Sequence, residues 1–383
     1  MDAVPFEIRF TDEALADLRA RLGRTRWPDE LPNAGWDYGT SLAYLKDLTA
    51  YWQNGFDWRA QERQLNSLPH FRTTIDGQGV HFIHLRSAAP ASIPIVLTHG
   101  WPSTFFELLD LVPLLTDPIR CGAAPVDAFD VVIPSLPGFG FSDPPRRRGF
   151  TSMDTAELWM KLMTGVLGYG RFAAHGGDVG AGVTSRLGLR YPDRLIGIHV
   201  SAVVRPEIGS GDPPLTEAEK DYLQLNDEWE REENGYGHIQ ETRPQTLAYG
   251  LNDSPVGLAA WIVEKYRAWS DCGGDIARRF TPDQLLTNVT LYWMTQTINS
   301  SMRHYYEQRH APWPFPRGTR VRVPTGVCLT VEPVDRAPRE WAERTYDVRR
   351  YTLLPRGGHF AAMEEPELLA DDIRAFFRPL RRS

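Results

Sequence analysis

The sequence predicts an α/β fold with a mostly parallel sheet, a helical cap insertion and an N-terminal helical meander. Short β-rich runs alternate with helical segments from about residue 76, the alternation stops near residue 205 and resumes after residue 310, and the first 75 residues read as helices and loops. Such alternation is typical of a parallel sheet covered on both faces. We therefore expect a meander (1–75), a first core part (76–204), a cap (205–310) and a second core part (311–383).

Length and composition limit the class of protein. The chain has 383 residues, of which 42% are hydrophobic and 24% charged, a balance typical of a globular protein with a large core. Acidic and basic residues are mixed, with a formal net charge of −7, so we expect no nucleic-acid partner. The three cysteines (Cys121, Cys272 and Cys328) form no C-x-x-C pair, which favours a reducing cytoplasm over a disulfide framework or a cysteine-based zinc site.

The meander is expected to wrap over the main domain. Leucines recur there at helical spacing, and four tryptophans of the kind that usually pack stand in or beside loops: Trp27, Trp36, Trp52 and Trp58. The first 24 residues mix charged and apolar positions, and nowhere do about 18 apolar residues run together without charges. We therefore expect neither a signal peptide nor a membrane-spanning segment, and no membrane partner.

The core and the cap differ in their periodicity. In the first core part, β-rich runs cover 80–85, 94–98, 129–134, 172–175 and 196–200, and helical segments cover 105–115, 155–167 and 180–191. The cap has helical patterns at 217–231, 256–270 and 288–307. In the second core part, strand-like runs at 327–331 and 351–354 precede a closing helix at 365–377. An interrupted α/β pattern that resumes later indicates a helical insertion into a sheet domain.

Residues 172–180 contain the G-x-nucleophile-x-G pattern of a nucleophile elbow, with Asp178 at the nucleophile and Gly176 and Gly180 at the small positions. A carboxylate that attacks an ester or amide would form a labile anhydride, whereas attack on an sp³ carbon forms a stable alkyl ester. The natural electrophiles are therefore epoxides and alkyl halides. Gly-Gly-Asp can also mark an ordinary turn in which the aspartate caps a helix. This motif alone therefore does not decide whether Asp178 is a nucleophile or a capping residue.

Two further loops complete a possible site. Residues 99–102, His-Gly-Trp-Pro, follow the apolar run 95–98, where a nucleophile-elbow fold supplies one oxyanion-hole donor. We expect the backbone N–H groups of Trp101 and Val179 to form this hole. His359 follows a strand-like run near the C-terminus, at the end of the sheet where open α/β folds build their sites, and is the expected general base.

The histidine needs a carboxylate that fixes its tautomer and stabilises the imidazolium. Glu332 directly follows the run 327–331, and Asp335 lies just beyond it. We place Glu332 first and keep Asp335 as the alternative. The chain order is then Asp178, Glu332, His359, which is nucleophile, acid and base.

With these motifs, the chain resembles the epoxide hydrolase family of the α/β-hydrolase superfamily that includes the microsomal and juvenile-hormone enzymes. Matching stretches are 26–28 (RWP), 99–103 (HGWPS), 176–178 (GGD) and 356–362 (RGGHFAA). The family places its acid a little under thirty residues before its histidine, and Glu332 has that spacing. Two departures are Val179, where many relatives carry tryptophan, and the unfamiliar residues 333–335 after the acid.

The resemblance implies hydrolysis of an epoxide to a vicinal diol through an aspartyl ester, with two cap tyrosines donating hydrogen bonds to the epoxide oxygen. Tyr236 matches the first of them and Tyr305 best matches the second, with Tyr306 as the alternative because one residue turns a helix by about 100°. No cofactor or metal is implied. His81 and His84 lie in an expected strand, where they face opposite sides and make a poor metal pair.

Alternative functions and the class of substrate also have to be considered. A haloalkane or haloacid dehalogenase would share the aspartate but not the paired tyrosines, and a non-catalytic receptor on this fold would typically lose a triad member. Four cap aromatics suit a bulky apolar or aryl epoxide: Trp261, Trp269, Tyr292 and Trp293. The chain also resembles bacterial relatives that act in enediyne antibiotic biosynthesis. The natural substrate, the stereochemistry and the oligomeric state, a homodimer included, stay open.

Overall fold

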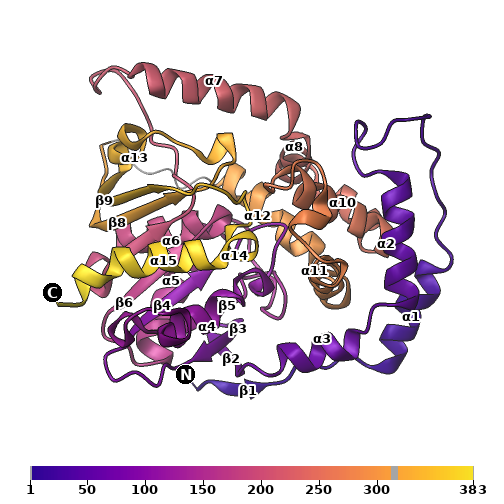
Figure 1. Cartoon of the computed structure of the whole chain (residues 1–383), viewed down its shortest axis with the longest axis horizontal. Helices are drawn as coiled ribbons and strands as arrows, with labels where there is room; N and C mark the ends of the chain where they lie inside the picture. The colour runs from indigo at the N-terminus through magenta and orange to yellow at the C-terminus, as the bar shows by residue number, and fades with distance from the viewer. Residues whose placement is uncertain (1, 312–317, 383) are drawn as a thin grey trace.

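The computed structural model describes residues 2–311 and 318–382 (Figure 1). In this part of the chain, nine strands form one sheet in the order β1-β2-β3-β5-β4-β6-β7-β8-β9. Strands β1, β2, β3 and β5 pair antiparallel, and all pairs from β5–β4 to β8–β9 are parallel. The strands are β1 Val4–Phe6, β2 His70–Ile75, β3 Gln78–Leu85, β4 Ile93–Thr98, β5 Phe129–Pro134, β6 Phe172–Gly176, β7 Leu195–Val200, β8 Val321–Leu329 and β9 Tyr346–Leu353.

Helices cover both faces of the parallel part, as the sequence predicts. They are α4 (Leu111–Thr116), α5 (Ser152–Lys161), α6 (Asp178–Arg190), α13 (Arg339–Thr345), α14 (Ala361–Glu364) and α15 (Pro366–Phe377). Helix α4 packs against α15, and α5 packs against α6. On β7, Gly197 lies under the α15 side chain Phe376, while the next residue, Ile198, lies under Gly188 of α6. Because successive strand residues face opposite sides, α15 and α6 cover opposite faces and β6 between them is buried on both.

Helices also fill the interval between β7 and β8, where the sequence predicts the cap. They are α7 (Glu217–Glu232), α8 (Gly235–Thr242), α9 (Pro244–Leu251), α10 (Pro255–Ala268), α11 (Pro282–Thr295) and α12 (Ile298–His310), and they lie over one end of the sheet (Figure 1). The helical segment expected at 288–307 is two helices. Gln296 adopts a left-handed conformation with φ of 55° and ends α11, so α12 starts in a new direction.

The meander contains more than the expected helices and loops. Helices α1 (Asp12–Leu22) and α2 (Leu42–Asn54) pack beside cap helix α10, and α2 also contacts α11. Helix α3 (Trp58–Leu65) leads from them back toward β1 (Figure 1). Strands β1 and β2 extend the sheet at its antiparallel edge, and sequence reasoning missed both. The packing role expected for the tryptophans is confirmed at Trp52 and Trp58, which are buried, with the Trp52 indole donating to Thr290 Oγ1 of α11 at 3.1 Å.

The last two strands begin earlier than the sequence predicts. Charged residues such as Arg322 on β8 and Arg349 on β9 interrupt the hydrophobic pattern, because they point to solvent while their neighbours are buried. In the first core part, the segment expected at 155–167 is helix α5 followed by a wider turn of π-helix at Leu162–Val166. Within the described ranges, no helix is both long and apolar enough to cross a membrane.

Candidate active site

The nucleophile elbow predicted from the sequence is present between β6 and α6. Asp178 is the first residue of α6 and has a φ of 46°, an unusual and strained value for a residue with a side chain. A Cβ atom on Gly180 would lie 2.0 Å from the carbonyl oxygen of Thr98, and one on Gly176 would lie 2.3 Å from that of Gly180. Only glycine fits these two positions, so the turn closes tightly and holds the carboxylate at the end of the sheet.

The predicted oxyanion-hole loop meets the nucleophile directly. The backbone N–H of Trp101 donates a 2.8 Å hydrogen bond to Asp178 Oδ1. Gly100 allows this approach, because a Cβ atom there would lie 2.3 Å from the same oxygen. Val179 follows Asp178 in the first turn of α6, where no helical carbonyl can accept its N–H. Among the described residues, no side chain accepts from that N–H either, so Val179 stays the second expected donor of the oxyanion hole.

His359 stands on the other side of the carboxylate. Its Nε2 lies 3.7 Å from Asp178 Oδ2, and its backbone N–H donates to the carbonyl of Trp269 at 2.8 Å. The neighbouring N–H groups of Gly358 and Phe360 both donate to the carboxylate of Glu364, at 2.9 and 3.1 Å. The histidine loop is therefore held between the cap and α14, which fixes the imidazole relative to the nucleophile.

The carboxyl group at Nδ1 of His359 belongs to Asp335, which the sequence analysis keeps as the alternative, and not to Glu332, which it places first. Asp335 Oδ2 lies 3.2 Å from Nδ1. After β8 a short 3-10 helix, Pro333–Asp335, turns the chain and brings the shorter side chain to the imidazole. Burial and then the charge of Asp335 raise the pKa of Glu332 to about 7, with a smaller opposing effect of His359. Glu332 is therefore a close neighbour of the pair.

The acids around His359 set its protonation. Burial alone would lower the pKa of the imidazole, but the hydrogen bond and charge of Asp335, followed by the charges of Asp178 and Glu107, raise that pKa to about 10. At neutral pH the free protein therefore holds an imidazolium beside the carboxylates of Asp178 and Asp335. Loss of any one of these negative charges would lower the pKa of His359.

Two of the predicted tyrosines come together above the nucleophile. The ring of Tyr236, on α8, stacks on Trp101 at 5.2 Å, and the ring of Tyr305, on α12, lies 6.0 Å from Tyr236 and 5.9 Å from Trp101. Burial first, and then charges that include Asp178, raise the pKa of both hydroxyls, so both are protonated donors at neutral pH. The alternative, Tyr306, instead stacks on His310 at 3.9 Å.

Sequence reasoning missed one residue of this site. Glu107 belongs to the 3-10 helix Phe105–Leu108 after the oxyanion-hole loop. Burial raises the pKa of its carboxyl to about 7, against smaller opposing effects that include His359 and Ser103. Its position seven residues after Gly100 has no strand or motif spacing that would have marked it. Beside Glu332, Glu107 is thus a second carboxyl group of the site with a pKa of about 7.

The four cap aromatics expected near the substrate divide into two pairs. Trp269 lies at the site, with its ring 5.2 Å from that of His359, and the Tyr292 hydroxyl donates to the carbonyl of Ser103 beneath it. Trp261 and Trp293 lie away from the nucleophile. The Trp261 indole donates to Gln240, and Trp293 lies under Arg21 of α1. Packing therefore explains the second pair.

Several buried histidines outside this site are engaged in hydrogen bonds. The His81 imidazole is hydrogen-bonded to His70 and Ser135, whereas the His84 imidazole is hydrogen-bonded to Tyr169. The two side chains therefore point in different directions, as the sequence predicts. Among residues 2–311 and 318–382, one group of possible metal ligands has its ligand atoms within 4.8 Å of one another: His199, Cys328 and Asp372. The Asp372 carboxylate already accepts from His199, Arg350 and Thr352. We therefore interpret this group as a buried polar network between β7, β8 and α15.

Comparison with known proteins matches the whole chain. A family model described as epoxide hydrolase N terminus matches residues 3–108, and one described as alpha/beta hydrolase family matches residues 95–372. Epoxide hydrolase 1 of the rabbit, Oryctolagus cuniculus, is 38% identical over 403 residues, which cover 97% of this chain and 88% of the relative.

Two crystal structures are similar over almost their full length. Juvenile hormone epoxide hydrolase from the silkworm, Bombyx mori, superposes with a TM-score of 0.90 at 30% identity, covering 99% of this chain and 95% of that structure. An epoxide hydrolase from Aspergillus niger superposes with a TM-score of 0.83 at 30% identity, covering 98% and 96%. The sheet, the helical insertion and the meander are therefore common to all three.

Proposed function

Because the chain belongs to the epoxide hydrolase family of α/β hydrolases, with an epoxide and water as substrates, we propose that it forms the diol through a covalent ester on Asp178. The observation that carries this proposal is the arrangement around one carboxylate. Trp101 N–H holds Oδ1 at 2.8 Å, and Nε2 of His359 lies 3.7 Å from Oδ2. A carboxylate held from one side, with a base on the other, suits attack on carbon followed by attack of water.

In the first step, an Asp178 oxygen attacks an epoxide carbon and the C–O bond of the ring breaks. The electron pair goes to the epoxide oxygen, which accepts hydrogen bonds from Tyr236 and Tyr305 and takes up a proton. That proton comes ultimately from the His359 imidazolium through the tyrosine hydroxyls or water. Asp178 becomes a neutral ester, which removes one of the charges that raise the pKa of His359. The step therefore leaves a neutral imidazole that is ready to act as a base.

In the second step, His359 takes a proton from water and the resulting hydroxide attacks the ester carbonyl carbon. The oxyanion accepts hydrogen bonds from the N–H groups of Trp101 and Val179. Its collapse breaks the bond to the alkoxide, which takes the proton of the new Asp178 carboxyl group. The diol leaves, and the carboxylate and imidazolium of the resting site are restored.

The proposal is tested by the origin of the diol oxygen. Wild-type protein in excess over styrene oxide is allowed one turnover in oxygen-18 water, and mass spectrometry follows the diol and the Asp178 peptide. An unlabelled diol and label in Asp178 are expected. A labelled diol from the first turnover would mean direct attack by water and would overturn the ester mechanism. Asp178→Asn is the matched control and should form no ester.

The aromatic site supports an apolar or aryl epoxide as the preferred substrate. Rings of Trp101, Trp269, Tyr236 and Tyr305 surround the nucleophile and His359. Such surfaces favour flat apolar groups. We expect kcat/KM to be higher for styrene oxide than for propylene oxide, and equal values for the two would contradict this substrate class.

A further inference from the structure

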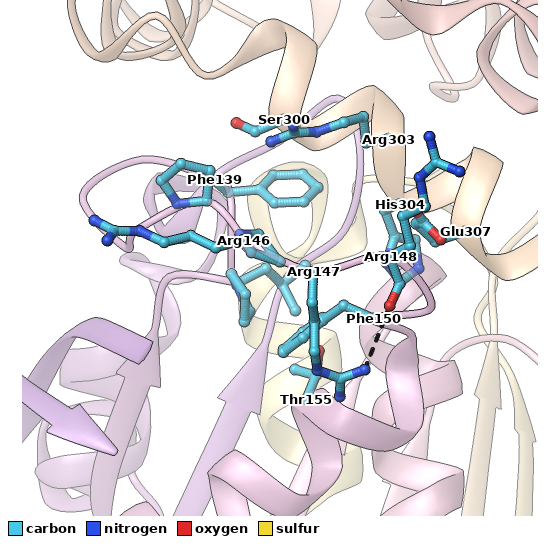
Figure 2. Close-up of a pocket in the computed structure, with 14 residues that line it drawn as sticks. Phe139, Arg146, Arg147, Arg148, Phe150, Thr155, Ser300, Arg303, His304 and Glu307 are labelled. Carbon is cyan, nitrogen blue, oxygen red and sulfur yellow. Dashed lines mark hydrogen bonds between the residues drawn. The ribbon is translucent and has the colours of Figure 1, made fainter. Parts of the chain in front are cut away.

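A cavity with an arginine-rich lining lies between α12 and the loop that follows β5. Its volume is about 520 Å³, and its lining contains none of the residues assigned above to the reaction. Figure 2 shows Arg146 of the loop on the left, Arg147 below, and Arg148 on the right beside His304 and Glu307 of α12. Arg303 of α12 is the fourth guanidinium group in this lining. We refer to this cavity as the arginine pocket.

Helix α12 borders both the pocket and the reaction site. Its lining residues Ser300, Arg303, His304 and Glu307 have the spacing i, i+3, i+4 and i+7, which places them on one face of the helix. Tyr305 leaves the same helix in another direction and meets Tyr236 and Trp101. A molecule in the pocket would therefore contact the helix that carries a tyrosine of the site.

The walls of the pocket are tied to each other. The Ser300 hydroxyl donates to the carbonyl of Gly138 at 2.6 Å, and the N–H of Gly149 donates to Glu307 Oε2 at 2.7 Å. Gly138 and Gly149 lie near the two ends of the loop segment that lines the pocket. The loop is thus fastened to α12 on both sides of the cavity, which makes the cavity a preformed site.

The charges in the pocket are unbalanced. Arg147 pairs with Asp154, whereas Arg146, Arg148 and Arg303 have no carboxylate partner within the described ranges. Glu307 is the one carboxylate among the lining residues, and the Gly149 N–H already occupies one of its oxygens. Arg146, Arg147 and Arg148 are exposed and Arg303 is half-buried, so their positive charges face the mouth of the pocket, where they attract an anion.

The remaining lining is largely apolar and backs onto the oxyanion-hole loop. The ring of Phe139 lies 5.4 Å from that of His99 and 6.4 Å from that of Tyr292. Burial, with a smaller effect of Arg186, lowers the pKa of His304 to about 4, so this histidine adds no charge at neutral pH. An inorganic ion would leave the apolar wall uncovered, whereas an organic anion would meet both the guanidinium groups and the rings.

We propose that the arginine pocket binds an organic anion, a carboxylate or phosphate attached to an apolar body. Guanidinium groups bind both kinds of anion through paired hydrogen bonds. The anion is either an acidic substituent of the epoxide substrate or a separate molecule that acts on α12. The first of these sources rests on the proposed function, and the second does not.

Binding is tested first, with phenyl phosphate and isothermal titration calorimetry at low salt. The double variant Arg148→Gln/Arg303→Gln removes two of the unpaired charges, and Arg63→Gln on the exposed side of α3 is the matched control. We expect phenyl phosphate to bind the wild type and the control equally, and the double variant at least tenfold more weakly. No binding to the wild type, or equal binding to all three proteins, would overturn the proposal.

Kinetics then distinguish the two sources. Styrene oxide is compared with styrene oxides that carry a carboxylate on para-alkyl chains of increasing length. If the anion is part of the substrate, kcat/KM of one or more charged epoxides falls at least tenfold in the double variant, while that of styrene oxide is unchanged. If it is a separate molecule, phenyl phosphate binding is lost and neither kcat/KM changes. Calorimetry measures binding and needs no turnover. If the protein hydrolysed no epoxide, the proposed function would be contradicted, but the binding measurement would still test the pocket.

Discussion

The acid that orients His359 gives the sharpest test of the site. Asp335→Asn keeps the shape of the side chain and removes its charge, and Glu332→Gln does the same at the neighbouring position. The structure places Asp335 Oδ2 3.2 Å from Nδ1 and raises the pKa of Glu332 to about 7. At pH 6 the Glu332 carboxyl group is mostly protonated and neutral. A neutral glutamine side chain therefore closely resembles the protonated glutamate that it replaces. The two substitutions should therefore have very different effects.

The size of the effect follows from the charge on the imidazole. The rise in the pKa of His359 from 6.5 to about 10 corresponds to about 5 kcal/mol in favour of the imidazolium. Burial opposes this rise, so the charges of Asp335, Asp178 and Glu107 together supply more than the net amount. We expect the charged hydrogen bond of Asp335 to contribute about 1.5–3 kcal/mol of it. That loss would slow hydrolysis of the ester by about ten- to 150-fold. Glu332→Gln should change the same rate by about twofold or less, or about 0.5 kcal/mol.

The assay follows the ester during a single turnover of styrene oxide at pH 6. The reaction is quenched at intervals, and the mass of the intact protein is measured by mass spectrometry. Wild type and Glu332→Gln should carry little adduct, whereas Asp335→Asn should accumulate the adduct and release it slowly. Circular dichroism controls for folding. If Glu332→Gln accumulated the ester and Asp335→Asn did not, the acid would be Glu332 and the geometric argument would be refuted.

Three other perturbations probe the site. Tyr305→Phe should slow ester formation about ten- to 100-fold, because it removes a hydrogen bond to the developing alkoxide, and rapid-quench kinetics should show no such change in Tyr306→Phe. Gly180→Ala places a Cβ atom 2.0 Å from the Thr98 carbonyl oxygen, so urea unfolding should show a loss of at least about 1–3 kcal/mol, and an unchanged midpoint would contradict the elbow geometry. The folded pKa of Glu107, about 7, lies above its ordinary value of 4.5, so its contribution to stability is complete below pH 4.5 and is lost as the pH rises through 7. Between pH 4.5 and 7, the free energy of unfolding should fall by up to about 3 kcal/mol more in wild type than in Glu107→Gln. If urea unfolding gave the same pH dependence for both proteins, the burial of the Glu107 carboxyl group would be excluded.

The parts that could be predicted from the sequence are those with local signals. The elbow needs glycines at fixed offsets from Asp178, because neighbouring backbone fills the space of a side chain, and that requirement is readable at Gly176 and Gly180. The alternation of strands and helices likewise follows from burial on both faces of a parallel sheet. The edge strand β1 and the first residues of β8 lack that signal, because exposed side chains interrupt their hydrophobic pattern.

The sequence by itself determined the fold class and the family's reaction class, and it predicted Asp178 as the carboxylate nucleophile and His359 as the base. The tertiary structure decided which carboxyl group reaches Nδ1 of His359, because a single 3-10 turn separates Glu332 from Asp335 and family spacing cannot resolve its direction. It also brought Glu107 to the site and turned Tyr305 rather than Tyr306 toward Trp101. Motifs record contacts between neighbours in the chain, whereas these placements depend on how distant segments pack, and on the desolvation and charge that packing creates.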